Sequence, residues 1–272
     1  MFLHLAQPVV VGQDRRQEVL WYTRCASRWK PAAHLPGQSG YCSEGGVVGA
    51  TDQIRRCSRE IPDAYRRLRA RNGPLGWWPG RTRLEIIVGA ILTQNTAWTN
   101  VEKAIRAMKD TRLLALNNLK TATALELEEA IRPSGYFRQK AKKISAFLQF
   151  LDDAYAGRLD QMSRASTPRL RNQLLAIWGI GPETADSILL YAFKRPVFVV
   201  DAYTRRIATR HRWIGASPTY DDLQALFVHH LPADVDLYND YHAQMVWTGK
   251  HHCRVQPRCE GCPLRALRAR GR

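Results

Sequence analysis

One aspartate, Asp201, follows a short apolar segment and precedes a stretch with helical spacing that contains Tyr203, Arg206 and Ile207. This order places Asp201 at a helix start, where its carboxylate can cap the helix by accepting backbone N–H bonds. The same donors and the helix dipole keep the carboxylate ionised near neutral pH. A fixed negative charge can stabilise a sugar with oxocarbenium character and orient an attacking water. Capping and catalysis are therefore compatible roles for Asp201.

A glycine-flanked turn lies about twenty residues before this aspartate. Gly179, Ile180 and Gly181 separate two stretches with helical spacing, and Pro182 suits the first position of the second helix. We expect the glycines to allow a tight turn and to aim backbone N–H groups outward, where they can bind a phosphate without reading sequence. The apolar faces expected on the two helices are Leu170, Leu174, Leu175 and Trp178, then Ala185, Ile188, Leu189 and Ala192.

The charge of the chain favours a polyanionic partner. Its 272 residues include 41 Lys and Arg against 24 Asp and Glu, which gives a formal charge of +17. Such an excess destabilises a compact chain by self-repulsion unless an anion neutralises it, so we expect nucleic acid rather than a merely solubilising surface. No apolar run approaches the roughly 18 to 20 residues that span a bilayer, so no membrane segment is expected and a cytoplasmic location is predicted.

The elements that must position these residues are predicted to be helices. Helical spacing starts near Ile61 and continues through most of the chain, whereas only residues 197 to 200 look like a strand, too short to define a sheet. The predicted fold is therefore all-α. Residues 1–58 contain Gly, Pro, Ser and three scattered cysteines without a sustained period, and we expect an irregular N-terminal extension there.

The hairpin, the aspartate, the segment from Ile91 to Trp98 and the terminal cysteines occur in an order that resembles the endonuclease III superfamily of DNA glycosylases. The resemblance runs from about residue 60 to the C-terminus. It implies two helical lobes with a DNA-binding cleft between them: a central bundle over 83–197 that holds the helix-hairpin-helix, and a second lobe of 59–82 plus 198–272. It also implies a monomer that binds double-stranded DNA with a damaged base, and Asp201 as the catalytic carboxylate.

Glu183 occupies the position at which bifunctional members of this superfamily carry a lysine that attacks the sugar. A carboxylate cannot form a Schiff base, so the resemblance implies a monofunctional glycosylase that uses water and leaves an intact abasic site. A glutamate in a first helical turn also has a plain explanation, because negative charge is mildly favourable there. Two alternatives stay open. One is an endonuclease III-type glycosylase and lyase for oxidised pyrimidines, and the other is a non-catalytic DNA-binding protein.

Two tryptophans bear on the choice of substrate. Trp78 and Trp98 match the positions of two aromatic rings that sandwich the flipped base in the branch that excises 3-methyladenine, although both could simply belong to the core. A 3-methylated purine is cationic, and facing π-systems attract a cation. An alkylated purine is therefore favoured over oxidised pyrimidines or mismatched bases. The other DNA contacts implied are Thr184 in the hairpin, Gln94, which would fill the gap left by the flipped nucleotide, and Lys140, which lies near the start of a basic helix.

Three cysteines near the C-terminus, Cys253, Cys259 and Cys262, resemble the start of the four-cysteine loop that holds a [4Fe–4S] cluster in this superfamily. The fourth cysteine, expected near Arg268, is absent, and the first gap holds five residues where six are usual. A cluster, a zinc site and a loop without metal all remain open. The neighbouring arginines would in every case provide a basic tail for phosphates.

Overall fold

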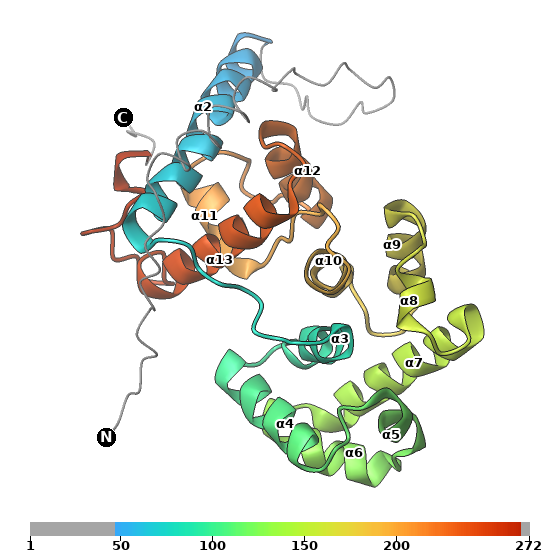
Figure 1. The fold of residues 1–272 in the computed structure, drawn as a ribbon. Coiled ribbons are helices and arrows are strands. Elements are labelled where there is room, and N and C mark those ends of the chain that lie inside the picture. Colours follow the sequence, from blue (N-terminus) through green and yellow to red (C-terminus); the bar gives the residue numbers. More distant parts are fainter. Residues whose placement is uncertain (1–46, 268–272) are drawn as a thin grey trace, which may run out of the picture. The chain divides into compact units, whose positions relative to one another are not determined.

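The computed structural model describes residues 47–267 (Figure 1). The contacts described below are those of the unit from Thr51 onward. The all-α prediction is confirmed, because the described residues form helices and no strand. The elements are α2 (Val47–Asn72), α3 (Arg83–Leu92), α4 (Trp98–Asp110), α5 (Leu116–Thr121), α6 (Ala124–Ile131), η1 (Arg132–Ser134), α7 (Phe137–Tyr155), α8 (Leu159–Met162), α9 (Thr167–Ala176), α10 (Pro182–Ser187), η2 (Ile188–Ala192), α11 (Ala202–Arg210), α12 (Tyr220–His230), α13 (Val235–His251) and η3 (Arg265–Leu267).

The first described helix corrects the expectation for the N-terminal region. Residues 47–58 were predicted to be irregular, but they form the first part of α2. Cys57 and Ile61 lie one turn apart and are both buried, with the Cys57 thiol 3.4 Å from the carbonyl oxygen of Trp213. These few buried positions among charged neighbours stabilise a helix through tertiary packing, which apolar spacing alone does not predict. Residues 1–46 of the predicted extension lie outside the described residues.

Helix α2 packs against the C-terminal helices. The hydroxyl of Tyr65 donates to Asp240 of α13 at 2.9 Å, and the hydroxyl of Tyr241 donates to the carbonyl of Ile61, also at 2.9 Å. Helix α13 also contacts α11 and η2. This grouping joins the segment before residue 83 to the end of the chain, while the predicted two lobes and their boundaries stay a prediction.

The helices from α4 to α9 form a second group, and α3, α10 and η2 lie between the two groups (Figure 1). Helix α3 contacts α4, α7, α10 and η2, and nine of its ten residues are buried. Residues 197–200 are extended but form no strand, and Phe198, Val199 and Val200 are buried. This buried connection leads from η2 directly to Asp201.

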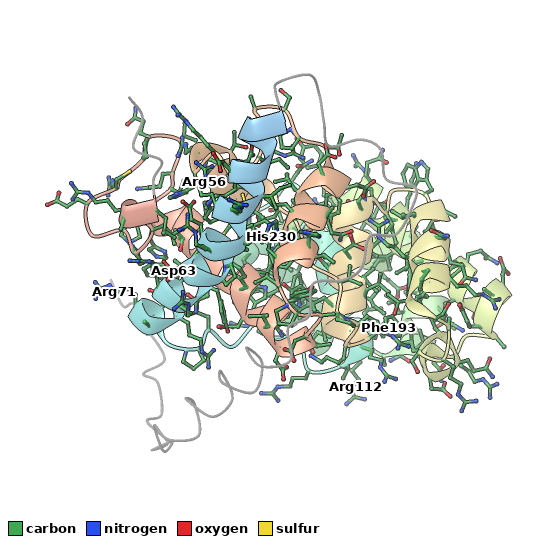
Figure 2. All side chains as sticks on the ribbon, turned by 90° about the horizontal axis from the view of Figure 1, so that it is seen from above. Arg56, Asp63, Arg71, Arg112, Phe193 and His230 are labelled. Atoms are coloured by element: carbon green, nitrogen blue, oxygen red, sulfur yellow. The ribbon has the colours of Figure 1, made fainter. Side chains whose placement is uncertain are left out.

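Charged side chains cover the exposed side of α2, where Arg56, Asp63 and Arg71 are spread along the helix (Figure 2). Asp63 pairs with Arg66 and Arg67 of the same helix, at 2.9 and 2.6 Å. Exposed pairs of this kind contribute about 0–1 kcal/mol each. No helix within residues 47–267 is long and apolar enough to cross a membrane.

Candidate active site

The predicted helix-hairpin-helix is present. Helix α9 ends at Ala176, and α10 begins with Pro182 at its first turn. Gly179 has a φ of +80°, and a Cβ at this residue would lie 2.6 Å from a side-chain carbon of Lys143. Gly181 has a φ of −91° and open space around the position of a Cβ. Glycine is therefore required at 179 for both backbone and steric reasons, but not at 181.

The residues between and after the glycines hold the turn from inside. Ile180 is 4% exposed, and its N–H donates to the carbonyl of Ile177 at 3.1 Å. Thr184 is buried, and its hydroxyl accepts a bond from Gln94 at 2.9 Å. The side chains of Ile180 and Thr184 are thus not presented to a ligand, which corrects their expected role in DNA contact. The N–H groups of the two glycines remain the predicted phosphate donors.

Trp178 was expected on the buried face of the helix before the turn, but its side chain is 57% exposed. The reason is that α9 ends two residues earlier, so the helical spacing that relates Trp178 to Leu174 no longer applies. The hairpin consequently presents a large aromatic ring to solvent.

Gln94 braces the hairpin. Its amide nitrogen donates to the carbonyl of Gly179 at 3.1 Å and to Thr184, while its amide oxygen accepts a bond from the ammonium group of Lys143. Gln94 lies in the turn after α3, so it links this turn to the hairpin and to α7. Filling a gap in a DNA duplex would require the side chain to leave these partners.

Lys140 does not face a ligand, contrary to the sequence-based expectation. Its side chain is 2% exposed, and its ammonium group donates to the carbonyls of Leu92 and Ser134 at 2.9 and 2.7 Å. Burial, and to a smaller extent the charge of Lys143, lowers the pKa of Lys140 to about 8. Lys140 therefore ties α3 to the turn before α7 and cannot bind a phosphate directly.

Asp201 is the N-cap of α11, as predicted. One carboxylate oxygen accepts a bond from the N–H of Thr204 at 2.7 Å, and the other lies 3.7 Å from Nε2 of His242. The side chain is 11% exposed. Burial alone would raise the pKa of Asp201, but His242 and the Thr204 N–H outweigh it and hold the pKa below its usual value. Asp201 is consequently an ionised carboxylate at neutral pH.

Glu183 shares the electrostatic environment of Asp201. It lies in the first turn of α10, where part of its side chain reaches solvent while neighbouring protein surrounds its carboxyl group. Desolvation by the surrounding protein and the negative charge of Asp201 raise the pKa of Glu183 to about 7, although His242 opposes this shift. The two carboxyl groups thus differ in protonation: Asp201 is ionised, and Glu183 titrates near neutral pH.

The two predicted pocket tryptophans lie together, but they are not parallel. The ring centroids of Trp78 and Trp98 are 4.9 Å apart with an interplanar angle of 82°. A base sandwiched between two rings needs roughly 7 Å between their planes, since each stacking contact takes about 3.5 Å. Trp98 must therefore swing away before a base can lie between the rings. Trp78 also contacts Tyr191, with ring centroids 5.0 Å apart and an interplanar angle of 35°.

This geometry agrees with a family comparison. A model of the HhH-GPD superfamily of base excision DNA repair proteins matches residues 88–232, more than half of the chain and including the hairpin and Asp201. The chain belongs to the HhH-GPD superfamily. Its class is therefore that of the DNA glycosylases of base excision repair.

Individual relatives support this HhH-GPD assignment. A provisionally named DNA repair glycosylase of Methanocaldococcus jannaschii is 43% identical over 195 residues, which cover 71% of this chain and 88% of that protein. A 3-methyladenine DNA glycosylase of H. pylori bound to 1,N6-ethenoadenine has a TM-score of 0.61 at 27% identity, covering 71% of this chain and 97% of that one. An endonuclease III in a non-covalent DNA complex has a TM-score of 0.64 at 24% identity, covering 80% and 94%. The last similarity shows the fold alone.

The three C-terminal cysteines of this HhH-GPD protein do not form a complete ligand set. Within the described part of the chain, no group of three or more His, Cys, Asp or Glu side chains is arranged to hold a metal ion. Cys253 accepts a bond from Arg210 at 3.4 Å, and burial followed by the neighbouring thiols raises the pKa of Cys262. Three cysteines without a fourth, not arranged as a metal site in this part of the chain, therefore do not fit the cluster that the sequence left open.

Three residues at the site have contacts that the sequence did not predict. His242 lies on α13 and Lys143 on α7, both far along the chain from the residues they contact at the site, whereas Tyr191 lies on η2, between the hairpin and Asp201. Tyr191 falls within an apolar stretch, and Lys143 looks like part of a solvated basic face. Only the tertiary fold brings these residues to the site.

Proposed function

We propose that this HhH-GPD protein is a monofunctional DNA glycosylase that excises an alkylated purine, such as 3-methyladenine, flipped out of double-stranded DNA. One observation carries the proposal. An ionised, N-capping Asp201 lies in the electrostatic field of Glu183, at the position where a bifunctional enzyme would carry an amine. The site therefore offers a carboxylate for hydrolysis and a carboxyl group in place of the nucleophilic lysine.

The proposed reaction is hydrolysis of the N-glycosidic bond. As this bond breaks, its electron pair moves to the base, which leaves neutral if it was a cationic methylated purine. The positive charge that develops on the sugar is stabilised by the Asp201 carboxylate. A water molecule then forms the new bond to the sugar carbon, and Asp201 takes up its proton. No covalent bond between enzyme and sugar is required, so the product is an intact abasic site.

The aromatic cluster supports a cationic base as the substrate. Trp78 and Trp98 touch each other, and the ring of Trp77 lies 6.2 and 6.0 Å from theirs. Aromatic faces attract a desolvated cation by about 2 kcal/mol or more. The similarity to the H. pylori 3-methyladenine enzyme, at 27% identity, points the same way. Oxidised pyrimidines are the alternative substrate class.

The hairpin and the net charge of +17 support duplex DNA as the partner. We propose that the N–H groups of Gly179 and Gly181 bind a backbone phosphate and that the enzyme acts as a monomer. In this scheme Gln94 leaves the hairpin to occupy the gap opened by the flipped nucleotide, and Lys143 loses one acceptor at the same time.

A lyase that uses a displaced lysine is the nearest alternative. Lys140 has the lowered pKa, about 8, that a nucleophilic amine requires. Its ammonium group is nevertheless buried and bound to two carbonyl oxygens, at the end of α3 and before α7. It cannot reach a sugar unless these two segments move apart. The position of Lys140 argues for the hydrolytic scheme.

The test is release of free base from methylated duplex DNA by the purified protein and its Asp201→Asn variant. The proposal expects 3-methyladenine release that the variant loses, with strand cleavage only after mild alkali. Cleavage without alkali, together with a borohydride-trapped adduct, would establish the lyase instead. Tight DNA binding that Asp201→Asn leaves intact, with no base released from any lesion, would identify a non-catalytic binding protein.

A further inference from the structure

A buried polar pair lies directly behind Asp201. Tyr191 is fully buried and His242 is 5% exposed, and the Tyr191 hydroxyl forms a hydrogen bond with Nδ1 of His242. Nε2 of His242 has no hydrogen-bond partner and lies 3.7 Å from a carboxylate oxygen of Asp201. Burying a polar nitrogen without a partner is costly, so this arrangement calls for an explanation beyond core packing.

The hydrogen bond from Tyr191 determines which ring nitrogen of His242 carries the proton. Burial raises the pKa of Tyr191 well above its usual value, so its hydroxyl remains protonated and can donate to Nδ1. The ring proton of His242 then lies on Nε2 and points toward Asp201. The opposite tautomer would aim a lone pair at an ionised carboxylate, which is electrostatically unfavourable.

Tyr191 reaches His242 because of an irregularity in its helix. Residues Ile188–Ala192 form a π-helical segment directly after α10, and such segments are frequent at functional sites. The ring of Tyr191 packs on Trp78 at 5.0 Å while its hydroxyl binds His242. A continuous set of contacts therefore runs from the aromatic cluster through Tyr191 and His242 to Asp201.

We propose that Tyr191 and His242 are a positioning pair, which orients the Asp201 carboxylate and links this orientation to the aromatic wall formed by Trp78. Thr204 fixes one carboxylate oxygen, and the Nε2–H of His242 directs the other. The 3.7 Å separation closes to a hydrogen bond when a base displaces the aromatic cluster, since catalytic hydrogen bonds often tighten in the complex. This inference rests on the proposed glycosylase function, in which Asp201 acts on the sugar.

The titratable groups that interact with His242 come from three places. They are Asp201 before α11, Glu183 of α10 and Tyr191 of η2. The effect of a change in His242 should therefore be measured on Asp201 itself, with Glu183 followed as a second group that interacts with His242.

The first experiment is a carboxyl ¹³C NMR titration of Asp201, assigned with Asp201→Asn, in the full chain and in Tyr191→Phe and His242→Gln. Tyr191→Phe removes only the hydroxyl and keeps the ring on Trp78. The proposal expects the Asp201 titration midpoint to move to higher pH in Tyr191→Phe, and to move less in His242→Gln, whose amide can still donate. Tyr65→Phe is the matched control, because it deletes another buried tyrosine hydroxyl, one that donates to Asp240 away from the site.

The second experiment is single-turnover release of 3-methyladenine across pH 5 to 9. Tyr191→Phe should lower the maximal rate about 5- to 10-fold, as expected for one lost hydrogen bond, and shift the acidic limb to higher pH. Affinity for abasic-site DNA should not change. If the titration midpoint of Asp201 were the same in Tyr191→Phe as in Tyr65→Phe, Tyr191 and His242 would not be a positioning pair. If the unaltered protein released no base, the proposed function would fail, while the NMR titration would still decide the role of the pair.

Discussion

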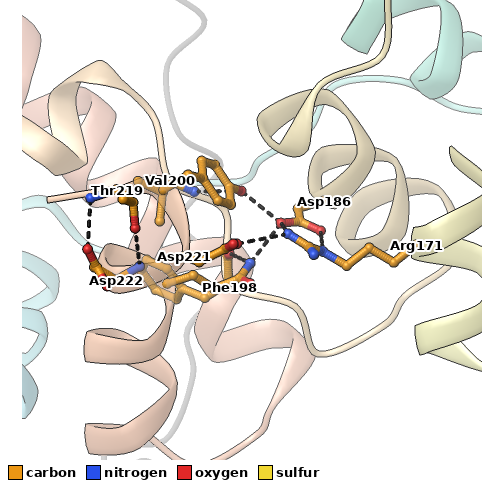
Figure 3. Close-up of polar contacts among 9 residues, drawn as sticks. Arg171, Asp186, Phe198, Val200, Thr219, Asp221 and Asp222 are labelled. Carbon is orange, nitrogen blue, oxygen red and sulfur yellow. Dashed lines mark hydrogen bonds and ion pairs between the residues drawn. The ribbon is translucent and has the colours of Figure 1, made fainter. Parts of the chain in front are cut away.

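Two aspartates fifteen residues apart, Asp186 and Asp201, have contrasting environments. Asp186 is completely buried, and its oxygens accept two bonds from Arg171, one from Tyr220 and one from Gln224 (Figure 3). Asp201 is 11% exposed and has one short hydrogen bond, from Thr204, and one long contact, to His242. The first carboxylate has every acceptor position occupied by protein, and the second does not.

This contrast separates a structural carboxylate from a reactive one. The bonds of Asp186 join α9, α10 and α12, so they hold the hairpin against the C-terminal helices (Figure 3). A buried charge with this many partners stabilises one arrangement and leaves no lone pair for chemistry. Asp201 keeps one oxygen available for a water molecule or a developing positive charge. Charge alone would not distinguish the two aspartates, but their hydrogen bonds do.

The largest expected effect is on activity, in Asp201→Asn. Removing the carboxylate charge should lower the single-turnover rate of base release about 100- to 1,000-fold, the cost of losing one preorganised electrostatic group. The free energy of unfolding should change by less than about 1 kcal/mol, since Asn caps a helix as well as Asp. Rapid-quench kinetics and urea unfolding measure the two quantities. If Asp201→Asn lowered the free energy of unfolding as much as the loss of a hydrogen-bond partner of Asp186 does, the two aspartates would not differ in role.

The next effect is on stability, in Arg171→Ala. This change leaves the buried Asp186 carboxylate without its cation, which should lower the free energy of unfolding by about 3 kcal/mol. The control is Arg132→Ala, because Arg132 pairs with Glu129 on the surface and should cost less than about 1 kcal/mol. Folded Arg171→Ala should keep the rate of base release within a few-fold. A stability loss no larger than that of the control would show that the buried Arg171–Asp186 pair does not hold the hairpin in place.

A smaller effect shows whether the hydrogen bonds of Asp186 alone hold the hairpin in its conformation. Gly179→Ala must adopt a φ of +80° and displace Lys143, so it should destabilise the protein by about 1–2 kcal/mol and weaken DNA binding. Gly181→Ala is the control, with an ordinary φ and open space around the new methyl group. Equal stability of the two variants in thermal unfolding would mean that the hydrogen bonds of Asp186 determine the conformation of the turn and that a glycine at 179 is not required.

The smallest effect concerns Glu183, whose pKa is raised to about 7. The folded state binds this proton more tightly than the unfolded state, so Glu183 makes folding less favourable as pH rises from about 4.5 to 7. Glu183→Gln should therefore gain stability relative to the unaltered protein at pH 8 but not at pH 4. In an Asp201→Asn background the gain should shrink, because one cause of the raised pKa is removed. A gain that is independent of pH would contradict this coupling.

The sequence predicted the hairpin and Asp201 because both depend on local chemistry. A glycine at a positive φ, a proline at a first turn and an aspartate at a helix start are determined by neighbours along the chain. Lys140 was misplaced because lysine is usually exposed, although its spacing from Ile144 and Leu151 puts it on the buried face of α7. His242 and Tyr191 could not be placed at the site, because the contact of His242 with Asp201 and that of Tyr191 with His242 exist only in the tertiary fold.

The π-helical segment that carries Tyr191 has a consequence for insertions and deletions. A π turn holds one more residue than an α turn, so it is equivalent to a one-residue insertion into a continuous helix. Deleting a single residue from Ile188–Leu190, before Tyr191, would convert the π turn into an α turn and change the direction in which the Tyr191 side chain leaves the helix, while the residues beyond the segment would keep their faces. Tyr191 would then turn away from His242 while the hairpin, N-terminal to the deletion, kept its register. The number of residues in this short segment, more than their types, thus decides whether Tyr191 can connect the aromatic cluster to the Asp201 carboxylate through His242.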